Sequence, residues 1–259
     1  MPSHRSLELL DRLAGEGRTA FTAATVRDAL NLSPQAASNL LSRLRDSGLV
    51  DRIAPGRYAL RQIGALGTSA VWDDLGSAVA ALFSPAPHRI GFLTALDQHG
   101  LLVRPVRTIQ VASPRRPRER TVTGRPLRVV QERADTVLIA TEPFGPSRLA
   151  TVERALLDAA SRPQLSGGAM RLAEALASVS GINDLVDLAN RLDAAAAYRR
   201  LGSIASTLAL PVARDLEPLP WKSLIELDRR SRGEHGWVDT TWGVAWPYPA
   251  YELEAIVTA

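Results

Sequence analysis

The sequence predicts an α+β protein in which a small N-terminal domain, made of helices and a β-hairpin, precedes a larger mixed α/β domain. At 259 residues the chain is long enough for two hydrophobic cores. Residues 1–62 show helical periodicity followed by two short strand-like stretches, and the glycines within residues 61–68 suit a linker. Residues 67–259 then mix helical and strand-like stretches, which indicates a second domain.

The best-defined element of the N-terminal domain is a helix that begins after Ser33. Ser33 suits the N-cap because its side-chain oxygen can accept a hydrogen bond from a first-turn N–H, and Pro34 suits the first helical position. Gly48 suits the left-handed end of the helix. An apolar stripe with spacing i, i+3, i+4 and i+7 would face a core, and it consists of Ala37, Leu40, Leu41 and Leu44.

The elements expected around this helix follow the order helix, short strand, helix, tight turn, helix and two-stranded wing. They are expected at 6–14, at 19–22, from Thr22 or Ala23 to Leu30, at 31–32, at 33–48, and at 49–53 with 57–60. This order is the one that a winged helix-turn-helix requires, and residues 32–60 resemble that motif of bacterial transcriptional regulators.

The polar side of the helix after Ser33 is the candidate DNA-reading surface. Gln and Asn can each bond two atoms of an adenine edge, and Arg can bond two acceptors of guanine, which suits insertion into the major groove. Ser33 and the helix N-terminus suit a phosphate. Arg52 and Arg57 flank the wing turn and are expected to contact the DNA backbone or minor groove. The residues expected to face the groove are Gln35, Ser38, Asn39, Ser42 and Arg43.

The larger domain is expected to combine several helices with three strands. Arg154 and Asp158 stand one helical turn apart and can form an ion pair. The helices are expected at 69–83, 91–99, 151–160, 169–178, 183–192 and 193–208, and the strands at 103–112, 127–131 and 137–141.

The basic residues, 30 Arg and one Lys, are distributed unevenly along the chain. Counting Lys and Arg against Asp and Glu gives +2 for residues 1–60, +5 for 61–150 and −3 for 151–259. The first 150 residues are therefore the part expected to meet a polyanion. A basic segment at 104–133 contains the arginine-rich stretch 113–125, which is either a solvated hairpin loop or an auxiliary contact to phosphate or to an acidic partner.

The C-terminal part, residues 219–259, contains four of the five tryptophans. One interpretation is a terminal antiparallel sheet that packs its own core or docks on the helices. The other is a partner-binding surface, because Trp is enriched at interaction hot spots. The four residues are Trp221, Trp237, Trp242 and Trp246.

Several kinds of chemistry have no visible signal in the sequence. There are no cysteines, the four histidines form no metal-ligand spacing, and there is neither a glycine-rich phosphate loop nor a GxSxG motif. We interpret the adjacent Asp73 and Asp74 as part of the solvent-exposed face of a helix. We therefore expect no cofactor, no metal and no enzymatic activity. Because no apolar run is long enough to span a bilayer, we expect a cytoplasmic protein that does not contact a membrane.

Beyond the winged helix, three further stretches in order are similar to the AbiEi family. They are TALDQHGLL at 94–102, TVERALLD at 151–158 and YRRLG at 198–202, and Thr94 stands where the family has a small serine. The resemblance covers roughly residues 5–205. It implies an antitoxin of a type IV toxin–antitoxin system, in which the N-terminal domain represses its own operon by binding promoter repeats. It also implies that the C-terminal domain neutralises a nucleotidyltransferase-like toxin, commonly without a stable complex.

Two alternative functions remain open at the level of the sequence. A ligand-responsive winged-helix transcriptional regulator without a toxin partner would have a deep apolar pocket within residues 70–259. A nucleic-acid-processing enzyme that uses the winged helix for targeting would have converging carboxylates.

Overall fold

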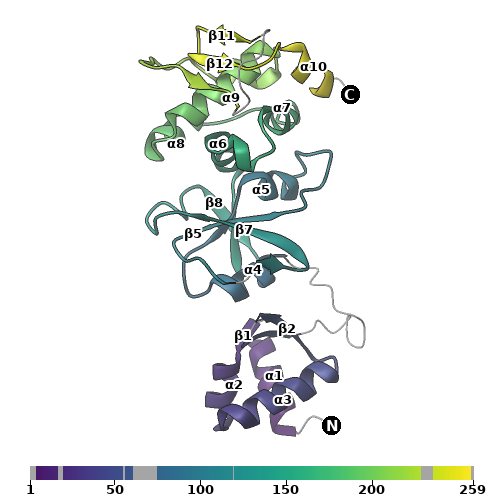
Figure 1. Ribbon diagram of the computed structural model, residues 1–259. Coiled ribbons are helices and arrows are strands. Elements are labelled where there is room, and N and C mark those ends of the chain that lie inside the picture. The colour runs from purple at the N-terminus through teal and green to yellow at the C-terminus, as the bar shows by residue number, and fades with distance from the viewer. Residues whose placement is uncertain are drawn as a thin grey trace.

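The computed structural model describes residues 4–16, 20–54, 56–60, 75–118, 120–228 and 236–257. Three layers follow one another along the long axis of the molecule (Figure 1). The N-terminal domain lies at one end, a central sheet with helices on both sides lies in the middle, and helices with a small sheet lie at the other end. The expected class, a winged helix-turn-helix followed by a larger mixed α/β part, is confirmed.

The N-terminal domain has the order of elements expected for a winged helix-turn-helix. Its sheet has the strand order β1-β3-β2 with antiparallel pairing throughout. Thr22 caps the second helix, and Thr22 and Thr25 form a reciprocal capping box. The elements are α1 (His4–Gly15), β1 (Ala20–Thr22), α2 (Ala23–Leu30), α3 (Pro34–Asp46), β2 (Val50–Ala54) and β3 (Arg57–Leu60).

This domain has a hydrophobic core of its own. The four residues of the expected apolar stripe on α3 are all buried. They meet apolar side chains of α1, α2 and the sheet, so each amphipathic element covers the apolar face of another. The core contains Leu9, Leu10, Leu13, Phe21, Val26, Leu40, Leu41, Leu44, Val50 and Tyr58.

The centre of the molecule is a six-stranded sheet with the order β6-β7-β5-β4-β9-β8. Its strands are β4 (Arg89–Ile90), β5 (Ile109–Ser113), β6 (Thr121–Val122), β7 (Arg125–Gln131), β8 (Thr141–Phe144) and β9 (Ser147–Ala150). The helix α4 (Leu75–Phe83) covers one side of the sheet, and α5 (Phe92–Gln98) and α6 (Val152–Ser161) lie on the other side (Figure 1). The helix α4 also contacts β1, β2 and β3, so it connects the N-terminal domain to the sheet.

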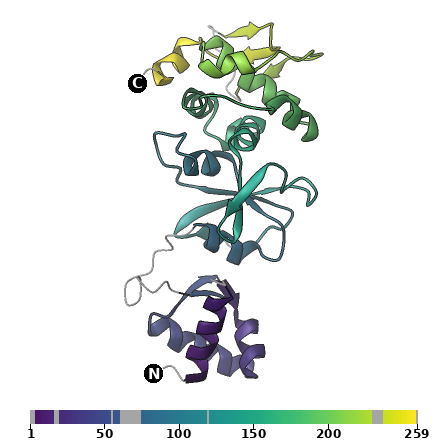
Figure 2. The same ribbon diagram turned by 180° about the vertical axis from the view of Figure 1, so that it is seen from behind.

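The remaining elements follow α6, and α7, α8 and α9 pack directly against it (Figure 2). They are α7 (Ala169–Ala177), α8 (Leu185–Arg191), α9 (Ala195–Thr207), β10 (Ile225–Glu226), β11 (Trp237–Asp239), β12 (Val244–Trp246) and α10 (Tyr251–Val257), with 3-10 turns at Pro163–Leu165 and Pro211–Asp215. One continuous set of buried apolar side chains runs from Ala78 to Leu253. The described residues from α4 onward therefore pack as a single unit, which we call the body (residues 75–257).

The Trp-rich end forms a sheet that docks on a helix, as one interpretation expected. Trp242 is buried against α9 and donates its indole N–H to Ser206, and Trp246 donates to Ser203. The expected all-antiparallel pairing is wrong, because β10 runs parallel to β12 while β11 runs antiparallel to it. Trp242 and Trp246 are therefore core residues, whereas Trp237 is half-buried and Trp221 is exposed.

The expected strand at 137–141 is also wrong. Residues 133–140 form turns, in which Val137 N–H donates to the Arg133 carbonyl and Ala140 has a φ of 52°. The carbonyls of Val137 and Ile139 accept from buried arginines, so they do not take part in a strand ladder. The strand pairing is instead made by β8 and β9, which form a tight hairpin just after this segment.

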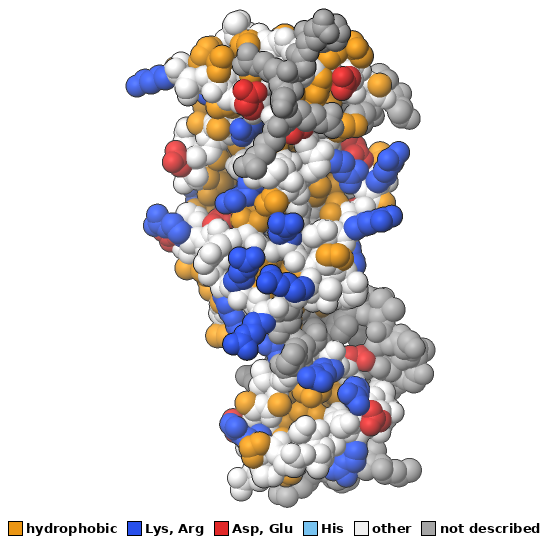
Figure 3. Space-filling view, in the orientation of Figure 1, with side chains coloured by type: hydrophobic (Ala, Val, Ile, Leu, Met, Phe, Trp, Pro, Cys, Tyr) orange, Lys and Arg blue, Asp and Glu red, His pale blue; other side chains and the backbone are white. Residues whose placement is uncertain are grey.

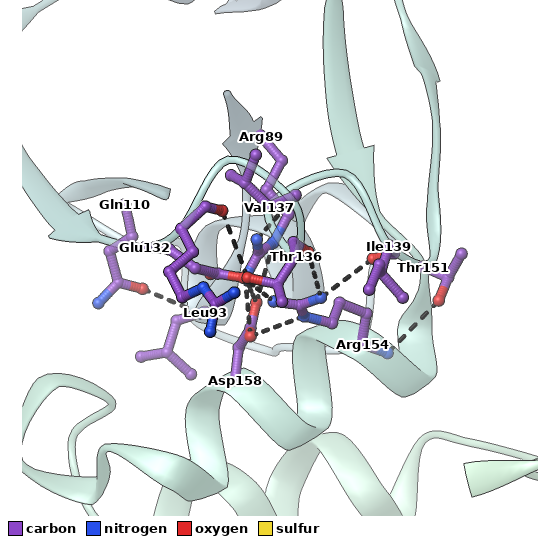
Figure 4. Close-up of polar contacts among 11 residues, drawn as sticks. Arg89, Leu93, Gln110, Glu132, Thr136, Val137, Ile139, Thr151, Arg154 and Asp158 are labelled. Atoms are coloured by element: carbon purple, nitrogen blue, oxygen red, sulfur yellow. Dashed lines mark hydrogen bonds and ion pairs between the residues drawn. The ribbon is translucent and has the colours of Figure 1, made fainter. Parts of the chain in front are cut away.

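Four charged side chains hold α6, the sheet and the turn segment together, and Arg89, Arg154 and Asp158 are buried while Glu132 is half-buried (Figure 4). Arg89 on β4 donates to both carboxylate oxygens of Asp158 on α6, at 2.8 and 2.9 Å, and pairs with Glu132 at 2.7 Å. Arg154 also bonds both acids, at 2.9 Å to Asp158 and 2.6 Å to Glu132. The ion pair expected between Arg154 and Asp158 is therefore present, within a network of two arginines and two carboxylates.

Each member of this ion-pair network is satisfied. Arg154 also donates to the carbonyls of Thr136 and Ile139, and Arg89 to that of Val137. Burial alone would raise the pKa of Glu132, but its bonds to Arg89 and Arg154 outweigh this and hold the pKa below its usual value. The Glu132 carboxylate is therefore kept ionised as a structural partner of the two arginines.

The stretches at 94–102, 151–158 and 198–202, which the sequence analysis singled out, have structural roles. The Thr94 hydroxyl donates to the Thr108 carbonyl and accepts from Gln110 N–H, so it links α5 to β5. In the third stretch Arg199 donates to the carbonyls of Trp242 and Gly243, which ties α9 to the terminal sheet. Gly202 leaves room for the Trp242 ring, which a Cβ at this position would meet at 2.2 Å.

We predict that Asp158→Ala destabilises the protein by about 3–5 kcal/mol, because both buried arginines lose a partner and only Glu132 remains to balance them. Denaturant unfolding followed by circular dichroism measures the change. Asp135→Ala is the control, since Asp135 pairs with Arg133 on the surface and its loss should cost less than about 1 kcal/mol. Equal effects of the two substitutions would contradict the role given to the network.

Candidate DNA-binding surface

The helix α3 presents a polar face to solvent on the side opposite its buried leucines. Its start is fixed by Ser33, whose hydroxyl accepts from Ala36 N–H at 3.2 Å. Gln35, Ser38 and Asn39 are exposed, as are Ser33 and Arg43, while Ser42 is half-buried. All six predicted helix residues are thus reachable from solvent, and all but Ser42 are exposed.

Two side chains of this face are already aligned with each other. Gln35 donates to the Asn39 side-chain oxygen at 3.1 Å, which places the two amides next to each other along the helix. Ser42 accepts from Arg45, at 3.3 Å. Arg43 is exposed, and among the described residues no acidic group pairs with it. The arrangement offers amide donors and acceptors next to a free guanidinium, which are the groups that read base edges.

The two wing arginines have different surroundings. Arg52 on β2 is exposed, whereas Arg57 on β3 is half-buried. The Arg57 guanidinium donates to the Ala81 carbonyl of α4 and so faces the body. Sequence reasoning placed both arginines on DNA because both flank the wing turn, but it had no information on which face of the wing α4 covers. The structure leaves Arg52 free for that contact and engages Arg57 between the domains.

The body carries a further basic region, which the sequence placed at 104–133. The loop that contains Arg115 and Arg116 is exposed, and it leads into β6, which pairs with β7. We define the arginine surface as the exposed arginines Arg104, Arg107, Arg116, Arg118, Arg120 and Arg128. Figure 3 shows Lys and Arg side chains gathered over the middle of the face on which α3 lies in Figure 1.

Hollows in this region are lined by arginines. One of about 250 Å³ lies between Arg116, Arg120 and Arg128. A wider one of about 920 Å³ is bordered by Arg104, Arg107, Arg125 and Arg171, with Asp97 as its acidic residue. Concave surfaces lined by guanidinium groups attract and position phosphate groups.

The described residues give no sign of a metal-assisted or histidine-based active site. They contain no group of three or more His, Cys, Asp or Glu placed to hold a metal ion. His88 bonds the Ala86 carbonyl and Ser147, and burial lowers its pKa, so it is a neutral structural side chain. His99 bonds the Ala150 carbonyl. Asp73 and Asp74 lie outside the described residues.

In the part of the chain that the structure describes, no helix has the length and apolar character needed to cross a membrane.

Comparison with known proteins agrees with the N-terminal domain as built above. Residues 8–61 match the family model described as "Transcriptional regulator, AbiEi antitoxin". This confirms the AbiEi resemblance over the winged helix-turn-helix. No curated protein matches the chain.

A solved structure is similar over nearly the whole chain. It is the crystal structure of the RV2827C protein from Mycobacterium tuberculosis, with a TM-score of 0.60 and 18% sequence identity. The match covers 96% of this chain and 92% of that chain. At this identity the similarity shows a common fold and nothing more. The common fold includes both the N-terminal domain and the body.

We predict that the double variant Asn39→Ala/Arg43→Ala binds its promoter at least tenfold more weakly, because each bidentate base contact contributes about 1–3 kcal/mol. Gel-shift titration at fixed salt measures the affinity. Arg12→Ala is the control, since Arg12 is an exposed arginine that belongs to α1 and not to α3. Unchanged affinity of the double variant would contradict the placement of α3 in the groove.

We predict that Arg52→Ala lowers the slope of log affinity against log salt by about one, because one phosphate contact and its released counterion are lost. Arg57→Ala should leave this slope near the wild-type value, since its guanidinium is occupied by the Ala81 carbonyl. Filter binding at several salt concentrations measures both slopes. The reverse outcome, a lower slope for Arg57→Ala only, would put Arg57 on the DNA.

Proposed function

We propose that this protein is the antitoxin of a type IV toxin–antitoxin system, and that it represses its own operon and neutralises a nucleotidyltransferase-like toxin. The observation that carries the proposal is the match of residues 8–61 to the AbiEi antitoxin regulators, which coincides with the observed winged helix-turn-helix. The stretches at 94–102, 151–158 and 198–202 support it, because they follow the winged helix in the order that the AbiEi resemblance implies. Each of them also makes a hydrogen bond or ion pair within the body.

In this proposal α3 enters the major groove of promoter repeats. Asn39 and Arg43 read base edges together with Gln35 and Ser38, while Ser33 and the start of the helix lie against a phosphate. Ser42 lies at the margin of the contact because it is half-buried and bonded to Arg45. Arg52 contacts the backbone beside the wing.

In the same proposal, the arginine surface of the body contacts the DNA that α3 reads. Its guanidinium groups are exposed, and the carboxylates of the neighbouring ion-pair network are neutralised by Arg89 and Arg154. Phosphate contacts there would add affinity without adding sequence specificity. This favours the second interpretation of the arginine-rich stretch 113–125, an auxiliary phosphate contact.

Neutralisation of the toxin is assigned to the body. The body has a continuous core that is separate from the core of the N-terminal domain, so a loss of DNA reading on α3 leaves it folded. We assign no toxin interface, because type IV antitoxins oppose their toxins without a stable complex.

A two-part assay in cells tests the proposal. We predict that the full chain restores growth when it is expressed from a foreign promoter together with the neighbouring nucleotidyltransferase-like toxin, and that it represses a reporter under its own promoter. The Asn39→Ala/Arg43→Ala variant should still restore growth but lose repression. A wild-type chain that represses without restoring growth would favour a ligand-responsive regulator without a toxin partner, and a chain that restores growth without repressing would contradict autoregulation.

A further inference from the structure

The body contains a cavity that the DNA-binding surface does not use. Its volume is about 490 Å³, within the range of small-molecule sites. It lies where the end of β7, the C-terminal half of α6 and the junction of α8 with α9 meet. The lining side chains that matter below are Phe92, Glu132, Leu157, Arg162, Arg191 and Asp193.

One wall of this cavity is apolar and rigid. Phe92 is 2% exposed and Leu157 is 1% exposed, and both line it. Phe92 has a φ of 56°, an uncommon backbone conformation for a bulky side chain, and it opens α5 directly after Gly91. Gly91 passes close to the ion-pair network, since a Cβ there would lie 3.0 Å from an Asp158 oxygen. The aromatic ring is thus held beside the cavity by a crowded segment of backbone.

The floor of the cavity is polar but carries no free charge. Glu132 and Asp158 line it, and both are paired with Arg89 and Arg154 (Figure 4). A bound anion would therefore meet a neutral network and not two bare carboxylates. This differs from the deep apolar pocket that a hydrophobic effector would need.

The mouth of the cavity supplies charge. Arg162 and Arg191 are exposed, and within the described ranges no acid pairs with either of them. Arg133, also at the mouth, is occupied by Asp135 at 2.5 Å. Asp193 contributes one carboxylate with no ion-pair partner among the described residues. Two guanidinium groups and one carboxylate therefore surround an opening next to a buried aromatic ring.

We propose that this cavity binds a mononucleotide. The phosphate would lie between Arg162 and Arg191, because guanidinium groups bond phosphate oxygens in pairs. The base would contact Phe92 and Leu157, and Asp193 would accept hydrogen bonds from hydroxyl or amino groups. This proposal rests on the body alone and is independent of the toxin–antitoxin assignment.

Isothermal titration calorimetry on the full chain tests the proposal, with AMP, GMP, CMP and UMP as probes and with phosphate and adenosine as partial ligands. At least one mononucleotide should bind, and at least tenfold more tightly than phosphate or the matching nucleoside. Arg162→Gln/Arg191→Gln should weaken this binding at least tenfold. Arg104→Gln/Arg107→Gln, a matched pair of exposed arginines lining another hollow, should change it less than twofold.

Three results would overturn the proposal: no binding of any mononucleotide, equal binding of phosphate alone, or equal weakening by the two double variants. Gel shift without nucleotide distinguishes this test from that of DNA binding, since Arg162→Gln/Arg191→Gln should bind the promoter like wild type. If the two arginines serve only the C-terminal ends of α6 and α8, the double variant will melt at a lower temperature while nucleotide binding is unchanged, which also overturns the proposal.

Discussion

The body depends on the ion-pair network of Arg89, Glu132, Arg154 and Asp158, in which all but Glu132 are buried. These side chains come from β4, from the residue after β7, and from two successive turns of α6. Buried charges are tolerated only when they are paired and fully hydrogen-bonded, so the network fixes one arrangement of sheet and helix. The position of α6 in turn determines the position of α9, because α9 packs on α6. In addition, Arg200 of α9 donates to the Ala160 carbonyl near the C-terminal end of α6.

On the other side of the sheet, α4 relates the body to the DNA-reading helix. Every residue from Gly76 to Phe83 is buried, because the helix lies between the central sheet and the sheet of the winged helix. The Arg57 contact to Ala81 adds a polar tie at this boundary. In the proposed function, a promoter long enough to pass both the face of α3 and the arginine surface of the body would meet base-reading and phosphate-binding groups in succession.

Local signals in the sequence were sufficient for the winged helix-turn-helix and for most helices. Ser33, Pro34 and the leucine stripe define α3 without reference to any distant residue, and the one-turn spacing of Arg154 and Asp158 already indicates their pairing. Long-range contacts decided the rest. Residues 137–141 look like a strand, yet Arg89 and Arg154 bind their carbonyls. Arg57 flanks the wing turn, and its guanidinium also donates to the Ala81 carbonyl of α4. Neither partner is visible in the local sequence.

The central claim is that α3 and the arginine surface bind the same DNA. Hydroxyl-radical footprinting of a long promoter fragment measures this directly, because it reports backbone protection at each nucleotide. We expect wild type to protect the site read by α3 and a flanking stretch, and the Arg116→Ala/Arg120→Ala/Arg128→Ala variant to lose the flanking protection while keeping the site. An identical footprint for both proteins, with equal affinity, would contradict the claim.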